Sequence, residues 1–167
     1  MQIQHHTRSS WRDVAFAAIA LLVVLADQLS KGWIRANIAV GHVSFDAGFF
    51  QIIHIQNTGA AFGIFKEHTS AIMVLVFIEI FILLLVVYLL RNRLSFFNTR
   101  LVYVGLGLIM GGAIGNQIDR IRLGYVTDFL DFKVWPAFNV ADASAVVGSF
   151  IVAFALIFLA KSAGDRE

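Results

Sequence analysis

Two aspartates, Asp128 and Asp142, have the clearest capacity for chemistry in this sequence. They lie in a polar run at residues 116–142, which separates two apolar stretches and holds four of the chain's eleven acidic residues. Two carboxyl groups that face one another near apolar surface cannot both ionise easily, so one keeps a proton while the other acts as a base. Such a pair can activate water and protonate a leaving amine, which is the chemistry of peptide hydrolysis.

Helix capping is an alternative explanation for part of this pattern. Asn139 is a good N-cap residue, and Asp142 stands three positions later, as in a capping box. A carboxylate in the first helical turn also suits the helix dipole. Capping leaves Asp128 unexplained, because we expect that residue in a polar and aromatic loop after the turn residue Gly124. Both explanations stay open on spacing alone.

Other chemistries fit the sequence less well. The chain has no cysteine, which excludes thiolate nucleophiles, thiolate metal sites and disulfides. His42, His54 and His68 do not form the His-Glu-x-x-His pattern of zinc peptidases. Ser30 and Lys31 are adjacent and would point to different helix faces. The basic residues are scattered and no phosphate-binding glycine loop is present. We therefore expect no metal, no cofactor and no nucleic-acid partner.

The composition indicates an integral membrane protein. Hydrophobic residues make up 59% of the 167 residues and charged residues only 14%, against about 25% charged residues in a soluble domain. About 20 apolar residues span the roughly 30 Å hydrocarbon core of a bilayer. We predict one domain over residues 1–167 with four transmembrane helices, at about 14–34, 70–90, 101–117 and 143–160. The first is expected to be a retained helix, because no small-residue cleavage site with a soluble domain follows it.

The remaining predictions concern the segments before and between the predicted spans. Residues 1–13 are expected to form a poorly ordered tail. The stretch 51–56 partly alternates, is rich in isoleucine and predicts a short strand, with a turn at 57–61. Several phenylalanines around it suggest a sheet near the membrane interface: Phe45, Phe49, Phe50, Phe62 and Phe65. The predicted fold is an all-α polytopic membrane protein, with a small extracytoplasmic β-sheet between helices one and two, and with outer loops at 35–69 and 118–142.

Polar residues inside the apolar stretches have two possible roles. Asp27 and Lys31 lie one helical turn apart, so they form either an interfacial ion pair with an extended lysine or part of a functional site. We favour function, since charges within a membrane are costly. Glu79 is expected to be protonated and hydrogen-bonded to a neighbouring helix.

Small residues indicate where the helices pack closely. Glycine recurs every four residues at Gly107, Gly111 and Gly115, which predicts close approach of another helix. Small residues on one face of the last span make that span a plausible partner: Ala141, Ala145 and Ser149.

Topology brings the polar residues to one membrane face. Residues 91–100 hold three arginines and no acid, which predicts that this loop and both termini are cytoplasmic. The ends of the spans and the two long connections then deliver nine polar residues to the outer face: Asp27, Lys31, Asn57, Asn116, Asp119, Arg120, Asp128, Asn139 and Asp142.

Five motifs in this order resemble those of bacterial lipoprotein signal peptidase, also called signal peptidase II. The likeness extends from the first span to the fourth, and the motifs lie at residues 27–31, 57–62, 115–120, 126–129 and 138–142. The connector between Asp128 and Asp142 is shorter than in many family members, so the resemblance does not imply the shape of the flap over the site.

The resemblance implies an aspartic endopeptidase of the bacterial inner membrane. It would remove the signal peptide from a prolipoprotein, cutting just before a cysteine that carries diacylglycerol. It implies a catalytic pair of Asp128 and Asp142, a substrate site of Asn57, Asn116, Arg120 and Asn139, and a supporting polar network of Asp27, Lys31 and Asp119. A globomycin-type inhibitor would block the site, membrane lipid would surround it, and the protein would act as a monomer.

Two other functions compete with this interpretation. A proton-coupled membrane carrier also uses intramembrane carboxylates, but it needs a polar path between both faces. A non-catalytic membrane scaffold would account for the glycines but not for the convergence of polar residues.

Overall fold

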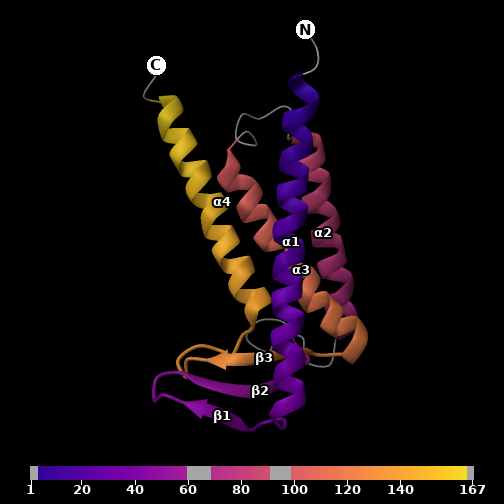
Figure 1. The fold of residues 1–167 in the computed structure, drawn as a ribbon, viewed down its shortest axis with the longest axis vertical. Helices are drawn as coiled ribbons and strands as arrows, with labels where there is room; N and C mark the ends of the chain where they lie inside the picture. The colour runs from indigo at the N-terminus through magenta and orange to yellow at the C-terminus, as the bar shows by residue number, and fades with distance from the viewer. Residues whose placement is uncertain (1–3, 60–68, 91–98, 165–167) are drawn as a thin grey trace.

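The computed structural model describes residues 4–59, 69–90 and 99–164. Its elements in chain order are α1 (Gln4–Asn37), β1 (Val43–Asp46), β2 (Gln51–Asn57), α2 (Thr69–Leu90), α3 (Arg100–Leu123), β3 (Val126–Asp131) and α4 (Val140–Gly164). The helices run side by side, and the sheet lies across the end of the bundle opposite the start of α1 and the end of α4 (Figure 1). The predictions for Phe62, Phe65, His68, the turn beyond Gly59, the arginines at 91 and 93 and the side chain of Glu79 lie outside the described residues.

Three described helices are long and apolar enough to cross a membrane: Trp11–Asn37 within α1, Arg100–Leu123 (α3) and Val140–Ile157 within α4. The apolar stretch of α2, Met73–Leu89, is shorter. The prediction of a mostly helical membrane protein is confirmed. The prediction of a disordered tail is wrong from Gln4 onward, since α1 already begins there. No proline or glycine precedes Gly32, so nothing in the sequence interrupts that helix.

The expected outer loop at 118–142 is instead largely regular structure. Helix α3 continues past Gln117 to Leu123, because its polar residues Gln117 and Asp119 are buried against the protein rather than in water. It ends at Gly124, which has the left-handed φ of 80° and donates its N–H to the Arg120 carbonyl at 3.0 Å. Glycine is favoured at this capping position. The chain then enters β3, so Asp128 lies in a strand.

The three strands form one antiparallel sheet in the order β1-β2-β3. The strand predicted at 51–56 is confirmed as β2. Ile34 of α1 and Ile38, the residue just after this helix, form a buried cluster with Phe129 of β3. The ring nitrogen Nδ1 of buried His54 lies 2.7 Å from the Ile38 carbonyl, so it donates a hydrogen bond there. These contacts hold the sheet, and therefore Asp128, against the end of α1.

The glycines pack differently from the prediction. A Cβ atom on Gly107 or Gly111 would be crowded against α1, at Ile19 and Val23 respectively, so these two glycines face α1; one on Gly115 would meet both Asp27 of α1 at 2.7 Å and Ala141 of α4 at 3.4 Å. The contact with α4 also uses other glycines of α3. A Cβ atom on Gly112 would collide with the Ala141 carbonyl, and one on Gly105 would meet Val152 at 2.6 Å. Glycine-dependent contacts therefore fix α3 against both neighbours.

Candidate active site

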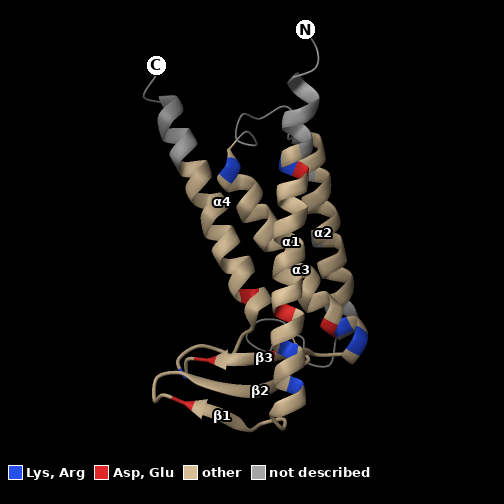
Figure 2. Cartoon of the chain, viewed as in Figure 1, with Lys and Arg blue, Asp and Glu red and all other residues tan. Residues whose placement is uncertain are grey.

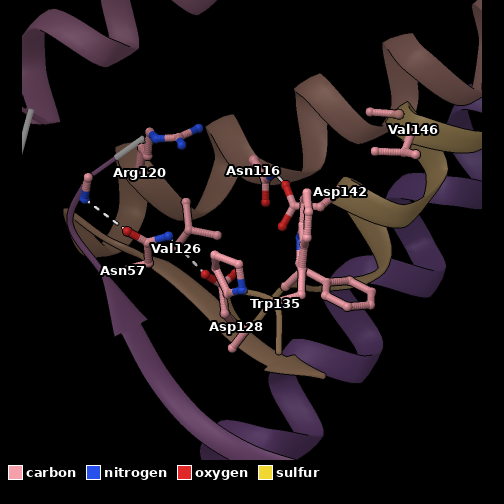
Figure 3. Close-up of a pocket in the computed structure, with 13 residues that line it drawn as sticks. Asn57, Asn116, Arg120, Val126, Asp128, Trp135, Asp142 and Val146 are labelled. Carbon is pink, nitrogen blue, oxygen red and sulfur yellow. Dashed lines mark hydrogen bonds between the residues drawn. The ribbon is translucent and has the colours of Figure 1, made fainter. Parts of the chain in front are cut away.

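The two aspartates singled out by the sequence meet at one pocket. Asp128 lies on β3 and Asp142 in the first turn of α4. Both line a cavity of about 280 Å³ between the sheet and the helix ends (Figure 3). The polar wall of this cavity consists of Asn57, Asn116, Arg120, Asp128 and Asp142. The remaining lining residues are Gly59, Val126, Trp135, Pro136, Ala137, Phe138, Ala145 and Val146.

Each oxygen of the two carboxyl groups accepts a hydrogen bond from an amide. Asp128 accepts from Asn57 Nδ2 at Oδ2 (2.9 Å) and from Asn139 Nδ2 at Oδ1 (2.7 Å). Asp142 accepts from Asn116 Nδ2 at Oδ1 (2.7 Å) and from the Asn139 backbone N–H at Oδ2 (3.3 Å). Four amide donors thus hold both carboxyl groups in fixed orientations.

The capping explanation and the site explanation both hold. The backbone N–H of Asp142 donates to Asn139 Oδ1 at 2.9 Å, while the Asn139 N–H donates back to the Asp142 carboxylate. This reciprocal pair is a capping box. Asn139 is fully buried and is not among the residues that line the cavity. It lies behind the two aspartates and contacts both of them.

The environment of Asp128 favours its neutral form. Burial and, to a lesser extent, the nearby charge of Asp142 raise the pKa of Asp128 to about 7, against the hydrogen bonds from Asn57 and Asn139, which lower it. Asp142 instead lies at the N-terminal end of a helix, where the dipole favours a negative charge. Asp128 is therefore the member of the pair better suited to hold a proton near neutral pH.

The predicted supporting residues also come together, behind the pocket. Lys31 Nζ lies 2.8 Å from Asp27 Oδ2, and neither side chain is exposed. A lysine extended toward the interface would be solvated, so that alternative is wrong. Asp119 joins the same group, with its Oδ2 at 3.5 Å from Lys31 Nζ. Among the described residues no group of three or more His, Cys, Asp and Glu side chains is arranged to hold a metal ion.

Comparison with known proteins assigns the chain to a family. The sequence profile described as Signal peptidase (SPase) II matches residues 19–158. The chain belongs to the signal peptidase II family. A Dehalococcoides mccartyi protein named lipoprotein signal peptidase is 45% identical over 156 residues, which cover 93% of this chain and 97% of the relative. A Moorella thermoacetica protein of the same name is 39% identical over 150 residues, with coverage of 89% and 97%.

A solved bacterial membrane enzyme shares the fold of this protein. The two chains superpose with a TM-score of 0.72 at 29% identity, and the match covers 91% of each chain. The resemblance read from the five motifs is thus confirmed, and it replaces the carrier and scaffold alternatives. A polytopic membrane peptidase is the class to which this chain belongs.

Three further residues make contacts around the site that were not predicted from the sequence. Gln28 Nε2 lies within hydrogen-bond distance of Asp27, the Gly115 carbonyl and Asp119. Arg35 Nη1 contacts Asp119 Oδ1 at 3.3 Å and Thr127 Oγ1 at 3.0 Å. Arg35 is one turn beyond Lys31, and that spacing could have indicated a shared face. Thr127 lies within the motif at residues 126–129, but its contact could not be predicted because it depends on strand β3, which the sequence did not indicate.

Proposed function

We propose that this protein removes the signal peptide from bacterial prolipoproteins by hydrolysing the peptide bond before a diacylglyceryl-modified cysteine, with Asp128 and Asp142 as the catalytic pair. Membership of the signal peptidase II family supports the reaction. The observation that carries the residue assignment is the meeting of two amide-held aspartates in one pocket at the end of the helices. No other pair of acidic residues among the described ones lines that pocket.

The two aspartates have different proposed roles. Asp142, at the positive end of α4, acts as the base that removes a proton from the attacking water. Asp128, protonated near neutral pH, donates its proton to the carbonyl oxygen as the tetrahedral intermediate forms. When the intermediate collapses, the proton taken by Asp142 passes to the amine that leaves. The bond between the signal peptide and the cysteine nitrogen breaks, and a hydroxyl group of the intermediate returns its proton to Asp128 as the new carboxylic acid forms, so the pair regains its single proton.

Other pocket residues bind the substrate in this proposal. Arg120 contributes a cation that can hold peptide carbonyl groups on the signal-peptide side. Asn57 and Asn116 line the cavity while holding the aspartates, and buried Asn139 orients both carboxyl groups from behind. The apolar wall, which includes Phe138, Ala145 and Val146, accepts the lipid-modified side of the substrate.

The position of the pocket supports a substrate anchored in lipid. The described charged residues lie near the helix ends and on the sheet, and the long middle parts of α1, α3 and α4 carry none (Figure 2). We propose four spans in a single domain, with α2 as the fourth, both termini in the cytoplasm of a bacterium and the sheet and pocket on the outer side of its inner membrane. In the same proposal the protein acts as a monomer and a globomycin-type inhibitor occupies the pocket.

A lipid-modified substrate tests this function directly. The acyl chains already lie in lipid before binding, so their transfer to the protein adds little affinity even at about 0.8 kcal/mol per methylene. Their expected role is to fix the depth of the scissile bond relative to the two aspartates. We expect purified protein in micelles to cleave the diacylglyceryl form with a higher kcat and a higher kcat/KM than the same prolipoprotein with unmodified cysteine. Equal kcat/KM for both substrates would contradict the proposed substrate class.

A further inference from the structure

Two buried carboxylates outside the pocket support the two aspartates in the same way. Asp27 Oδ1 accepts the backbone N–H of Ala141 at 3.0 Å, and Ala141 immediately precedes Asp142. Asp119 Oδ2 accepts the backbone N–H of Thr127 at 3.0 Å, and Thr127 immediately precedes Asp128. Each aspartate of the pair thus follows a backbone amide that is bound to a buried carboxylate.

Lys31 contacts both supporting carboxylates and one amide of the pocket. Its fully buried ammonium lies 2.8 Å from Asp27 Oδ2, 3.5 Å from Asp119 Oδ2 and 2.8 Å from Asn116 Oδ1. Asn116 Oδ1 also accepts a hydrogen bond from Asn139 Nδ2 at 3.1 Å, so this oxygen accepts two hydrogen bonds. Its nitrogen must therefore point toward Asp142 Oδ1. Lys31 fixes which way the Asn116 amide faces.

We propose that Lys31 is a positioning residue that sets the separation and orientation of Asp128 and Asp142 by linking their three supports, Asp27, Asp119 and Asn116. This inference rests on the proposed role of the two aspartates as the catalytic pair. Helix α1 thereby connects the strand that carries one aspartate with the helix that carries the other. Asp27 is also packed tightly against α3, since a Cβ atom on Gly115 would lie 2.7 Å from Asp27 Oδ2.

The charge of Lys31 also acts on the pair. The charged groups around it come from every neighbouring element: Asp27 and Arg35 of α1, Asp119 and Arg120 of α3, Asp128 of β3 and Asp142 of α4. Its ammonium lowers the pKa of Asp128 and so partly offsets the effect of burial. Loss of this charge should move the alkaline limb of the activity profile to higher pH. Loss of packing alone would not move the limb.

The test substitutes a neutral side chain of similar length. In Lys31→Met we expect kcat on the diacylglyceryl prolipoprotein to fall about 100-fold, the loss typical of a misplacement of about 1 Å, with KM little changed. The alkaline limb of the pH profile of kcat should move to higher pH. Lys133→Met is the matched control, because it removes a lysine from an exposed ion pair with Asp46 at 2.8 Å and should leave the limb in place. Gln28→Met controls for lost packing, since it removes neutral hydrogen bonds to Asp27 and Asp119 without removing a charge.

A second variant is needed in case Lys31→Met does not fold, because this substitution leaves two buried carboxylates without their cation. The double variant Lys31→Met/Asp27→Asn removes one of those charges and keeps an oxygen that can accept from Ala141, and it should show the same loss of kcat. If neither variant folds, hydrogen exchange on the wild-type protein decides. The amides of Thr127 and Ala141 should be protected as strongly as amides inside α3, and exchange as fast as an unstructured peptide would overturn the proposal.

The outcomes separate this inference from the proposed function. If a folded Lys31→Met protein kept wild-type kcat and an unmoved alkaline limb, Lys31 would not be a positioning residue, while cleavage by the wild type would still support the peptidase. If the wild type did not cleave the lipid-modified prolipoprotein at all, the proposed function itself would be wrong.

Discussion

Asn139 donates a 2.7 Å hydrogen bond from Nδ2 to Oδ1 of Asp128, and it also caps the helix that carries Asp142. One side chain thus joins the strand aspartate to the first turn of α4. The distance between the two aspartates is therefore set by this contact and by the helix, and it depends little on the connector of residues 132–139.

The two roles of Asn139 can be separated by substitution. Asn139→Ser keeps a capping oxygen but cannot reach Asp128 with an amide, so kcat should fall while the thermal midpoint stays near that of the wild type. Asn139→Ala loses the cap as well, and we expect a further destabilisation of about 1 kcal/mol. Thermal unfolding and cleavage kinetics on the same preparations provide the measurement. A Ser variant with wild-type kcat would show that the contact with Asp128 is dispensable.

Close packing between α3 and α4 gives a second prediction. Gly112→Ala places a methyl group against the Ala141 carbonyl at the start of α4, so we expect a lower thermal midpoint and a loss of activity through displacement of Asp142. Gly32→Ala is the matched control, because its Cβ would meet only the end of the Arg35 side chain at 4.0 Å. That change should be neutral or stabilising by up to about 1 kcal/mol. Equal effects of both substitutions would contradict the packing described for α3.

The sequence predicted the membrane class, the strand at β2 and the polar residues that come together around the pocket, but not the contacts that connect them. The apolar stretches and the capping pattern of Asn139 and Asp142 are local signals, which can be read without a structure. Strand β3 was missed because Val126–Asp131 becomes a strand by pairing with β2, and the sequence does not show that pairing. The partner of Gly107 and Gly111 was assigned wrongly for a similar reason, since Gly107 and Gly112 differ only in which neighbour they face.

The raised pKa of Asp128 gives a pH prediction. Between about pH 4, where a free aspartate ionises, and about pH 7, the folded protein keeps a proton that the unfolded chain has lost. Stability should therefore fall as the pH rises through this window. Since the pair needs one proton, kcat should also decline as the pH rises through about 7.

A single substitution tests the origin of that decline. The hydrogen bond from Asn57 Nδ2 lowers the pKa of Asp128, so Asn57→Ala should move the decline in kcat to higher pH. The measurement is a set of kcat values from about pH 5 to about pH 9 for both proteins. A decline that moves to lower pH in Asn57→Ala would contradict the assignment of this limb to Asp128.

The orientation in the membrane is tested by labelling. A cysteine at the N-terminus, at residue 92 or at the C-terminus should be protected in intact cells from a thiol reagent that cannot cross the membrane. A cysteine in place of His42, beside β1, should react. The chain has no cysteine of its own, so only the introduced cysteine can react with the reagent. Reaction at residue 92 together with protection at residue 42 would invert the proposed topology.

The most direct test of the account is loss of each carboxyl group in turn. Asp128→Asn and Asp142→Asn keep the size of the side chains, and we expect each to lower kcat on diacylglyceryl prolipoprotein by at least about 1000-fold while the protein still folds. The double variant should be little worse than either single one, because the two groups act as a unit. Single-turnover cleavage followed by gel shift measures all three. Near wild-type turnover in either single variant would contradict the proposed catalytic pair.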